Sequence, residues 1–200
     1  DTGARLRERG IPLIVREGDP PTVITDMAAD ACLVVMDRGY LRHQKRWRQQ
    51  VAEAIDTPLV QVESDVVVPV DAVSGKEEYA AATIRPKIHR LLDRFLVPLQ
   101  ERKVKYPMPD PGWESLPWQD PDRILSRLDI DRSVPRVNGF TGGTSEAQRR
   151  LQEFIARGLD RFATGRNDPG KDALSGMSPY LHFGQVSPLE IALAVKDSGS

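Results

Sequence analysis

The sequence has little of what several protein classes require. It contains one cysteine, Cys32, so a disulfide framework is excluded, and we expect a cytoplasmic protein in which this thiol is a small buried residue. No apolar run approaches the roughly 20 residues that span a bilayer, so we expect no membrane partner. The chain opens on DTGARLRERG, with neither an initiator methionine nor a signal peptide, as an internal stretch of a longer protein would.

An excess of charge of one sign is also missing. Residues 1–100 carry 14 Lys and Arg against 15 Asp and Glu, and residues 101–200 carry 14 of each kind. This balance excludes a nucleic-acid-binding module of high net positive charge, so any site for a polyanion must be a local patch. With 40% hydrophobic and 28% charged residues, the composition is typical of a folded globular chain.

The first part of the chain alternates short apolar runs with amphipathic ones. The runs at residues 11–15, 31–36 and 57–62 are rich in Val, Ile and Leu and predict three buried strands. The stretches between them predict two helices, one starting near Pro20 and one over residues 41–55. Strands and helices alternating at this spacing predict an α/β fold with a Rossmann-like parallel sheet.

The next stretches differ in character. Residues 77–99 predict one or two helices, with a break or restart at Pro86. Residues 97–144 are rich in proline and weak in periodicity, which predicts a linker between two domains, and Trp113 and Trp118 indicate that it packs along a surface.

Helical patterning resumes after the linker. Ser145 and Gln148 have the spacing of a capping box, and the apolar residues that follow share one helical face. A last helix is predicted after Ser187 as N-cap, with Pro188 at its first position.

Most motifs that would indicate a functional site are incomplete. The stretch SGKEE at residues 74–78 lacks the upstream glycine and the hydroxyl of a phosphate-binding loop, and GFTGGT at residues 139–144 follows no strand, as a dinucleotide fingerprint would. The histidines are far apart and no nucleophile elbow occurs, so we expect no metal site and no catalytic residue in this chain. Glu77 and Glu78, and the basic cluster over residues 38–48, are better interpreted as solvated helix faces than as sites.

The segment from Arg161 to Pro188 is the strongest remaining candidate. Ser175 and Ser178 offer hydroxyl groups, Gly176 permits a close approach to the backbone, and a helix start follows. Together these features can hold an anion such as a pyrophosphate. The alternative is that Ser178 is an ordinary helix N-cap.

Two blocks of this sequence resemble one known family. The stretch RNDPGKDALSGMSPYLHFGQVSP resembles the flavin-binding motif of the photolyase/cryptochrome family, in the form found in class II cyclobutane pyrimidine dimer photolyases. The stretch from WRQQVAEAI to EEYAAATIRPKI resembles the same class. The resemblance covers residues 31–95 and 145–195. Within it, the segments MDRGYLR and VPVD differ from the sequences that are most common in class II.

The resemblance implies a domain organisation. Residues 1–96 would be an α/β antenna domain truncated at its start, residues 97–144 an interdomain linker, and residues 145–200 the beginning of an all-α FAD-binding domain truncated at its end. FAD would be bound in a U-shaped conformation, and an antenna chromophore of the deazaflavin or folate type would bind the first domain.

Site residues follow from the resemblance only where the motif matches. Ser175, Gly176, Met177 and Ser178 fall on the segment that contacts the flavin phosphates through hydroxyls and backbone N–H groups. Phe162 falls where the family commonly has a flavin-contacting tyrosine, so the ring is kept and the hydroxyl is lost. The electron-relay tryptophans and the lesion-contacting residues would lie beyond Ser200.

The implied function is repair of UV-damaged DNA by a monomeric flavoprotein. Light-excited reduced FAD would donate an electron to a cyclobutane pyrimidine dimer that is flipped out of the duplex, and the dimer would split. The chain alone, with one rim of the pocket, is expected to be inactive and to hold FAD weakly. Two alternatives are a cryptochrome-like photoreceptor and a non-enzymatic nucleotide-binding module built on the α/β half.

Overall fold

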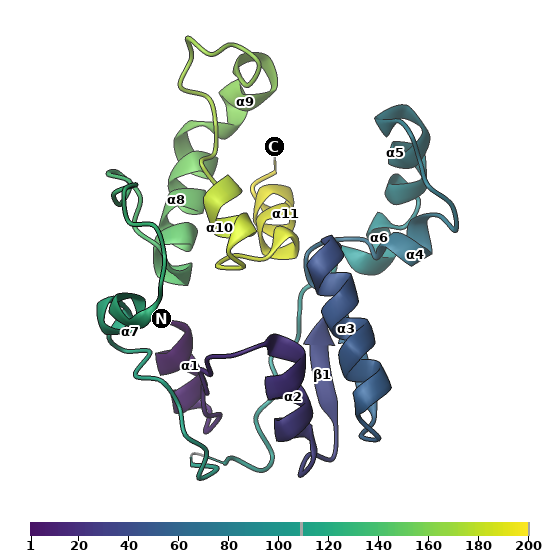
Figure 1. Ribbon diagram of the computed structural model, residues 1–200. Helices are drawn as coiled ribbons and strands as arrows, with labels where there is room; N and C mark the ends of the chain where they lie inside the picture. The colour runs from purple at the N-terminus through teal and green to yellow at the C-terminus, as the bar shows by residue number, and fades with distance from the viewer. Residues whose placement is uncertain (109, 200) are drawn as a thin grey trace. The chain divides into compact units, whose positions relative to one another are not determined.

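The structure is a computed structural model that describes residues 1–108 and 110–199 (Figure 1). It divides into two compact units, each made of two stretches of chain. Unit 1 comprises Asp1–Val62 and Arg102–Thr141, and unit 2 comprises Glu63–Glu101 and the chain from Gly142 onwards. Positions 109 and 200, which fall in the predicted linker and the predicted last domain, lie outside the described residues.

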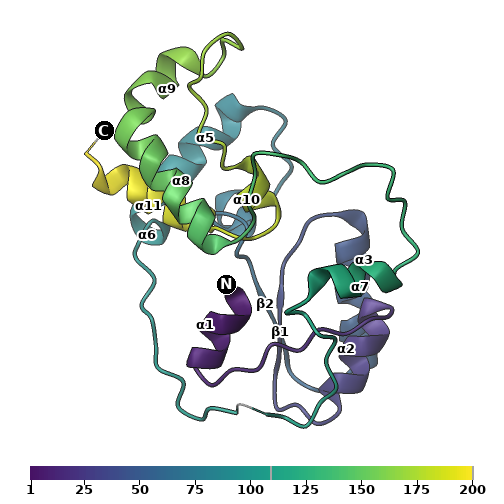
Figure 2. The same cartoon turned by 90° about the vertical axis from the view of Figure 1, so that its left-hand side faces the viewer.

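Unit 1 contains a small parallel sheet. Strands β1 (Val34–Asp37) and β2 (Leu59–Val62) pair in parallel, and helix α3 (Arg42–Ala54) connects them. Helix α2 (Pro20–Ala28) packs against α3, and Figure 2 shows both helices on the same side of the strands. This arrangement confirms the α/β prediction for the first part of the chain.

The start of α2 follows the signals in its sequence. Asp19 is the N-cap and its carboxylate accepts a hydrogen bond from the Thr22 backbone N–H, while Pro20 occupies the first helical position. The N-cap satisfies a backbone donor that the helix cannot satisfy itself. The helix start near Pro20 is therefore confirmed, whereas the Asp19 cap was not predicted from the sequence.

The predicted strand at residues 11–15 is wrong. This segment is not part of the described sheet, and its backbone bonds to a distant part of the chain instead. The Val15 N–H donates to Ser115 Oγ at 3.0 Å, and the Val15 carbonyl accepts from the Leu116 N–H at 2.8 Å. Since these backbone groups are satisfied outside the sheet, the apolar run needs no strand partner.

Most of the predicted linker, residues 102–141, belongs to unit 1 and packs against its N-terminal stretch, as the tryptophans indicated. A Cβ on Gly3 of helix α1 (Thr2–Glu8) would lie 2.2 Å from the Trp118 ring, so only glycine fits against the indole. The Arg7 guanidinium lies 5.7 Å from the same ring centroid. The proline-rich stretch also forms one helix, α7 (Pro121–Arg127).

The expectation that Cys32 is buried is also wrong, because its side chain is exposed. It precedes β1, and α2 and α3 cover only one face of the two strands. The apolar run that contains it is therefore only partly covered, which sequence patterning could not distinguish from a fully buried strand.

Unit 2 begins with three short helices. Their bounds are α4 (Val70–Val73), α5 (Ala81–His89) and α6 (Leu92–Phe95). The predicted break at Pro86 is wrong, since α5 continues past Pro86 and ends at His89. Proline at the sixth position removes one intrahelical hydrogen bond, and the helix continues for only three more residues.

Glu78 is not on a solvated face, contrary to expectation. Its side chain is 6% exposed, and it accepts hydrogen bonds from Lys87 Nζ and from Ser74 Oγ. The Lys87 ammonium, followed by the Ser74 and Thr83 hydroxyls, lowers the pKa of the Glu78 carboxyl from 4.5 to about 2. The ion pair ties the loop after α4 to helix α5.

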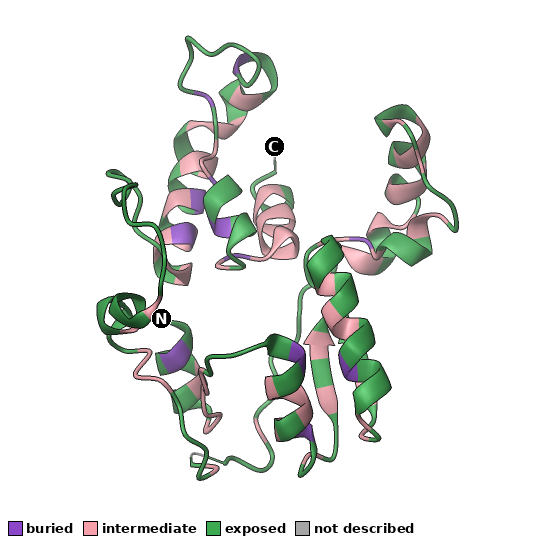
Figure 3. Cartoon of the chain, viewed as in Figure 1, coloured by how far each residue is buried: buried purple, intermediate pink, exposed green. Residues whose placement is uncertain are grey.

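The second stretch of unit 2 contains the longest described helix. The bounds are α8 (Thr144–Arg157), α9 (Leu159–Gly165), α10 (Ser178–His182) and α11 (Pro188–Asp197). Figure 3 shows buried positions on α8 and on α10. The caps predicted for α11 are confirmed, because the Ser187 hydroxyl accepts from the Leu189 N–H at 3.1 Å.

Candidate functional site

The predicted flavin segment rests on a buried cluster in unit 2. Met177 and Tyr180 are 3% and 1% exposed and pack with Ala147, Leu151 and Val186. Leu151 is on α8, whereas Tyr180 is on α10, so the cluster fixes one helix against the other. Met177 is therefore an anchor whose side chain faces the core, and only its backbone is left for a ligand.

Residues 175–177 are neither helix nor strand and lead into α10 at Ser178, and we call residues 175–178 a turn because a side-chain hydroxyl closes it. The Ser175 hydroxyl accepts a hydrogen bond from the Met177 N–H at 3.4 Å. Gly176 has a φ of +65°, in the left-handed region that favours glycine, and no described atom lies within 4 Å of a Cβ built on it. The turn therefore holds open space beside Gly176.

Ser178 begins helix α10 and is exposed. The alternative in which Ser178 is the N-cap is wrong, because the N-cap is Met177 and no side chain caps the helix. Helix α10 has only five residues, so its dipole adds little to anion binding. The polar groups that this site offers to a ligand are therefore the hydroxyl and backbone groups of residues 175–178.

Phe162 lies on helix α9, apart in sequence and in contacts from this turn. Its ring meets the Phe154 ring edge to face at 5.6 Å, and the Arg166 guanidinium lies 5.5 Å from its centroid. Among the described residues these are its ring contacts, and neither partner belongs to residues 175–178. The structure thus brings four of the five predicted site residues together and leaves Phe162 separate.

A charged network beside the buried cluster was missed by sequence reasoning. The Arg150 guanidinium lies 6.0 Å from the Tyr180 ring centroid and also donates to Glu146 at 2.8 Å. Hydrogen bonds from Arg149 and then Arg150 lower the pKa of the Glu146 carboxyl from 4.5 to about 2. The pattern E-x-x-R-R at the start of α8 was the available signal.

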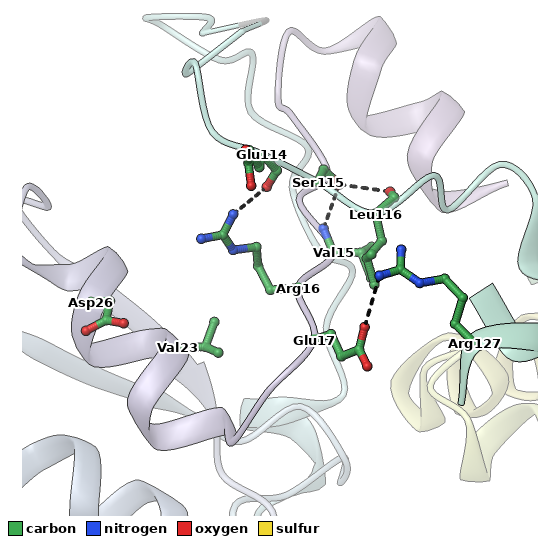
Figure 4. Close-up of a pocket in the computed structure, with 9 residues that line it drawn as sticks. All are labelled: Val15, Arg16, Glu17, Val23, Asp26, Glu114, Ser115, Leu116 and Arg127. Atoms are coloured by element: carbon green, nitrogen blue, oxygen red, sulfur yellow. Dashed lines mark hydrogen bonds and ion pairs between the residues drawn. The ribbon is translucent and has the colours of Figure 1, made fainter. Parts of the chain in front are cut away.

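Unit 1 contains a cavity of about 640 Å³ between residues 15–26 and the stretch around Glu114 (Figure 4). Three of its charged side chains already have partners, because Arg16 donates to the Glu114 carbonyl at 2.9 Å and Arg127 pairs with Glu17 at 3.8 Å. A typical ligand cavity is mostly apolar with a few converging polar groups, and this one has a largely polar wall. Its two arginines are engaged, and the other charged groups that line it are the carboxylates of Asp26 and Glu114.

A second cavity, of about 520 Å³, lies in unit 2 between α4 and α5. Its walls are mainly Val and Ile side chains, and Glu78 is among the other residues that line it. No residue of the 175–178 turn lines it. We therefore do not assign it to the flavin segment.

Within residues 1–108 and 110–199, no helix has the length and hydropathy that crossing a membrane requires. The same part of the chain contains no group of three or more His, Cys, Asp or Glu side chains placed to hold a metal ion.

The parallel strands with their connecting helix make this an α/β protein, and comparison with known proteins identifies its family. The model of the DNA photolyase family matches residues 1–107, more than half of the chain. The chain belongs to the DNA photolyase family.

Several relatives align over most of the chain. A deoxyribodipyrimidine photo-lyase of Methanothermobacter thermautotrophicus is 48% identical over all of this chain and 44% of its own length. One from Potorous tridactylus is 38% identical over 82% of this chain and 30% of its own. A cryptochrome DASH of Natronomonas pharaonis is 32% identical over 94% of this chain and 41% of its own. The chain thus spans less than half the length of these relatives.

A solved structure supports the fold. The bacterial class III photolyase from Agrobacterium tumefaciens matches 94% of this chain and 40% of its own, with a TM-score of 0.63 at 19% identity. At that identity the match bears on the fold alone. The assignment of this chain to class II stays a prediction.

Proposed function

We propose that this chain is part of a deoxyribodipyrimidine photo-lyase that uses light and FAD to repair cyclobutane pyrimidine dimers in UV-damaged DNA. The observation that carries the proposal is the 48% identity, over the whole chain, with the Methanothermobacter relative of that name. The resemblance of the two sequence blocks to class II photolyases supports cyclobutane pyrimidine dimers as the lesion. A flipped lesion costs less to unpair than an intact base pair, which favours damaged DNA as the partner.

The turn at residues 175–178 fits the phosphates of FAD. The open space beside Gly176 allows a ligand to approach the backbone, and Ser178 is exposed next to it. Ser175 and Ser178 would donate hydroxyl hydrogen bonds, while Gly176 and Met177 would contribute backbone N–H groups, the Met177 N–H exchanging its 3.4 Å bond to Ser175 Oγ for a phosphate oxygen. When bound, FAD supplies the light-driven electron transfer, and these residues bind and orient it.

Phe162 is proposed as a ring contact of the flavin without a polar contribution. Its ring is half-buried on α9 and already packs edge to face on Phe154. We therefore expect it to limit the position of a ligand by its shape.

The antenna chromophore, of the deazaflavin or folate type, is part of the proposal without assigned residues. The unit 1 cavity has a suitable volume for such a molecule, but its arginines are engaged with Glu17 and with the Glu114 carbonyl. The domain boundaries proposed for the whole protein are an antenna domain to residue 96, a linker to 144 and a flavin domain from 145.

The test uses the intact protein, meaning the full product of the gene that encodes this chain. Dimer loss from UV-irradiated DNA is measured in blue or near-ultraviolet light and in darkness. We expect loss in light alone, and a strong decrease for the double variant Ser175→Ala with Ser178→Ala. Ser126→Ala, at an exposed serine of α7, is the matched control and should retain repair. Absence of light-dependent dimer loss in the wild type would refute the proposal.

The alternative of a cryptochrome-like photoreceptor is favoured by one observation, the alignment with the cryptochrome DASH. It keeps the fold and FAD but replaces repair by light-dependent binding of a partner. Partner binding in light without dimer loss would support this alternative. Protection of residues 1–96 from proteolysis by a nucleotide, without any need for flavin, would support a non-enzymatic module.

A further inference from the structure

Helix α8 begins without a capping side chain of its own. Its N-cap is Gly143, and Ser145, which the sequence predicted as the cap, lies inside the helix. The N-cap N–H is among the donors that a helix cannot satisfy internally, and in a capping box the third helical residue accepts it. That residue is Glu146, whose carboxylate is bound instead by Arg149 and Arg150.

Gln185 supplies the missing acceptor from 42 residues away. Its Oε1 accepts a hydrogen bond from the Gly143 N–H at 2.9 Å. A Cβ on Gly142 would lie 3.3 Å from Gln185 Nε2, and Gly143 has a φ of +114°. The two glycines of GFTGGT thus let the backbone approach the Gln185 amide, which gives that motif a structural role.

The backbone of Gln185 is bonded to α10 at the same time. Its N–H donates to the Tyr180 carbonyl at 2.8 Å, and the Leu181 N–H donates to the Met177 carbonyl at 3.0 Å. Tyr180 and Met177 are both in the buried cluster. One residue therefore connects the first turn of α8 to the short helix that follows the 175–178 turn.

We propose that Gln185 is a positioning residue for the flavin-binding turn. Its side-chain amide holds the start of α8, its backbone holds α10, and together they set where Ser175 and Ser178 present their hydroxyls. It does not touch the ligand itself. This inference rests on the proposed function, since it concerns the site at which FAD would bind.

The structural half is tested by hydrogen exchange of the amides of residues 143–147 in the intact protein. Gln185→Leu keeps the approximate size and removes the acceptor, so these amides should exchange about tenfold faster, in line with the loss of a helix cap. Gln185→Glu keeps an acceptor oxygen and places negative charge at a helix N-terminus, so it should restore slow exchange. The matched control is Gln152→Leu, at an exposed position of α8, which should not accelerate these amides.

The functional half is tested by FAD titration of the intact protein, followed by flavin fluorescence. Gln185→Leu should weaken FAD binding about tenfold, whereas Gln185→Glu should stay within about twofold of the wild type. If Gln185→Leu does not fold, Gln185→Asn, which is one methylene shorter, is expected to show the same changes at smaller size.

The outcomes separate the two proposals. Unchanged exchange at residues 143–147 in Gln185→Leu would overturn the cap. Faster exchange with unchanged FAD affinity would overturn the positioning role and leave the proposed function intact. A wild type that binds no FAD would overturn the proposed function together with the positioning role, while the exchange data would still decide the cap.

Discussion

The two units use their apolar residues in different ways. In unit 1, Val35 and Val60 are directly paired across the strands, yet they are 57% and 46% exposed. In unit 2, Leu151 and Tyr180 are 2% and 1% exposed. An amphipathic helix buries its apolar face by packing against one neighbouring helix, whereas a parallel strand pair is buried only when other elements pack on both of its faces. The helical cluster is therefore complete within its unit, and the strand pair is covered on one face.

The largest expected effect tests the helical cluster. Leu151→Ala removes a buried side chain from a packed site, so we expect it to lower the free energy of unfolding of unit 2 by about 2–5 kcal/mol. Leu174→Ala is the matched control, because Leu174 is 65% exposed, and should change it by about 0.5 kcal/mol or less. Hydrogen exchange of the α8 amides measures both. Equal effects of the two variants would contradict the burial contrast.

The next effect tests the two faces of the strand pair. Val51 on α3 is 1% exposed, and Val51→Ala should lower the stability of unit 1 by about 2 kcal/mol. Val35→Ala should cost about 0.5 kcal/mol or less. Chemical denaturation followed through unit 1 amides measures the difference. A cost at Val35 equal to that at Val51 would mean that the outer face is covered in solution.

Acid should affect the two units differently. The pKa of Glu78 in unit 2 is lowered to about 2, so its ion pair stabilises the fold above the ordinary value of 4.5 and this contribution is lost as the pH falls from 4.5 toward 2. Exchange of the α5 amides should accelerate over that range, and less so in Glu78→Gln. The Arg127–Glu17 pair of unit 1 is 3.8 Å long and exposed, so Glu17→Gln should alter little. If acid accelerates exchange of the α5 amides as much in Glu78→Gln as in the wild type, the loss of the Glu78 ion pair is not the cause.

The smallest effect concerns the uncovered end of β1. Because Cys32 is exposed, a thiol reagent should label it in the folded chain at a rate within about tenfold of that in the unfolded chain. The labelling is followed by mass spectrometry under native and denaturing conditions. Labelling that requires unfolding would show that this part of unit 1 is more covered than its structure indicates.

The cap predicted at Ser145 is wrong, because the N-cap of α8 is Gly143. Other helix starts were predicted from local patterns: Ser187 is an N-cap, α2 begins at Pro20, and α3 lies within residues 41–55. These features depend on residues within one turn of each other, so the sequence holds the whole signal.

Two of the failures have one cause, which is competition from residues elsewhere in the chain. Residues 11–15 look like a strand but bond to residues 115 and 116, and Glu78 looks solvated but pairs with Lys87. In the candidate site, the motif resemblance predicts residues 175–178 and assigns no role to Gln185, because its contact with Gly143 joins positions 42 residues apart. Such contacts have no local periodicity or spacing to reveal them.

The most direct test of the proposed site is hydrogen exchange of the intact protein with and without FAD. We expect FAD to slow exchange in the peptide that covers residues 175–178, and Ser175→Ala with Ser178→Ala to remove this protection. Protection by FAD elsewhere in the protein, with no change in that peptide, would contradict the assignment of the turn as the flavin-binding segment.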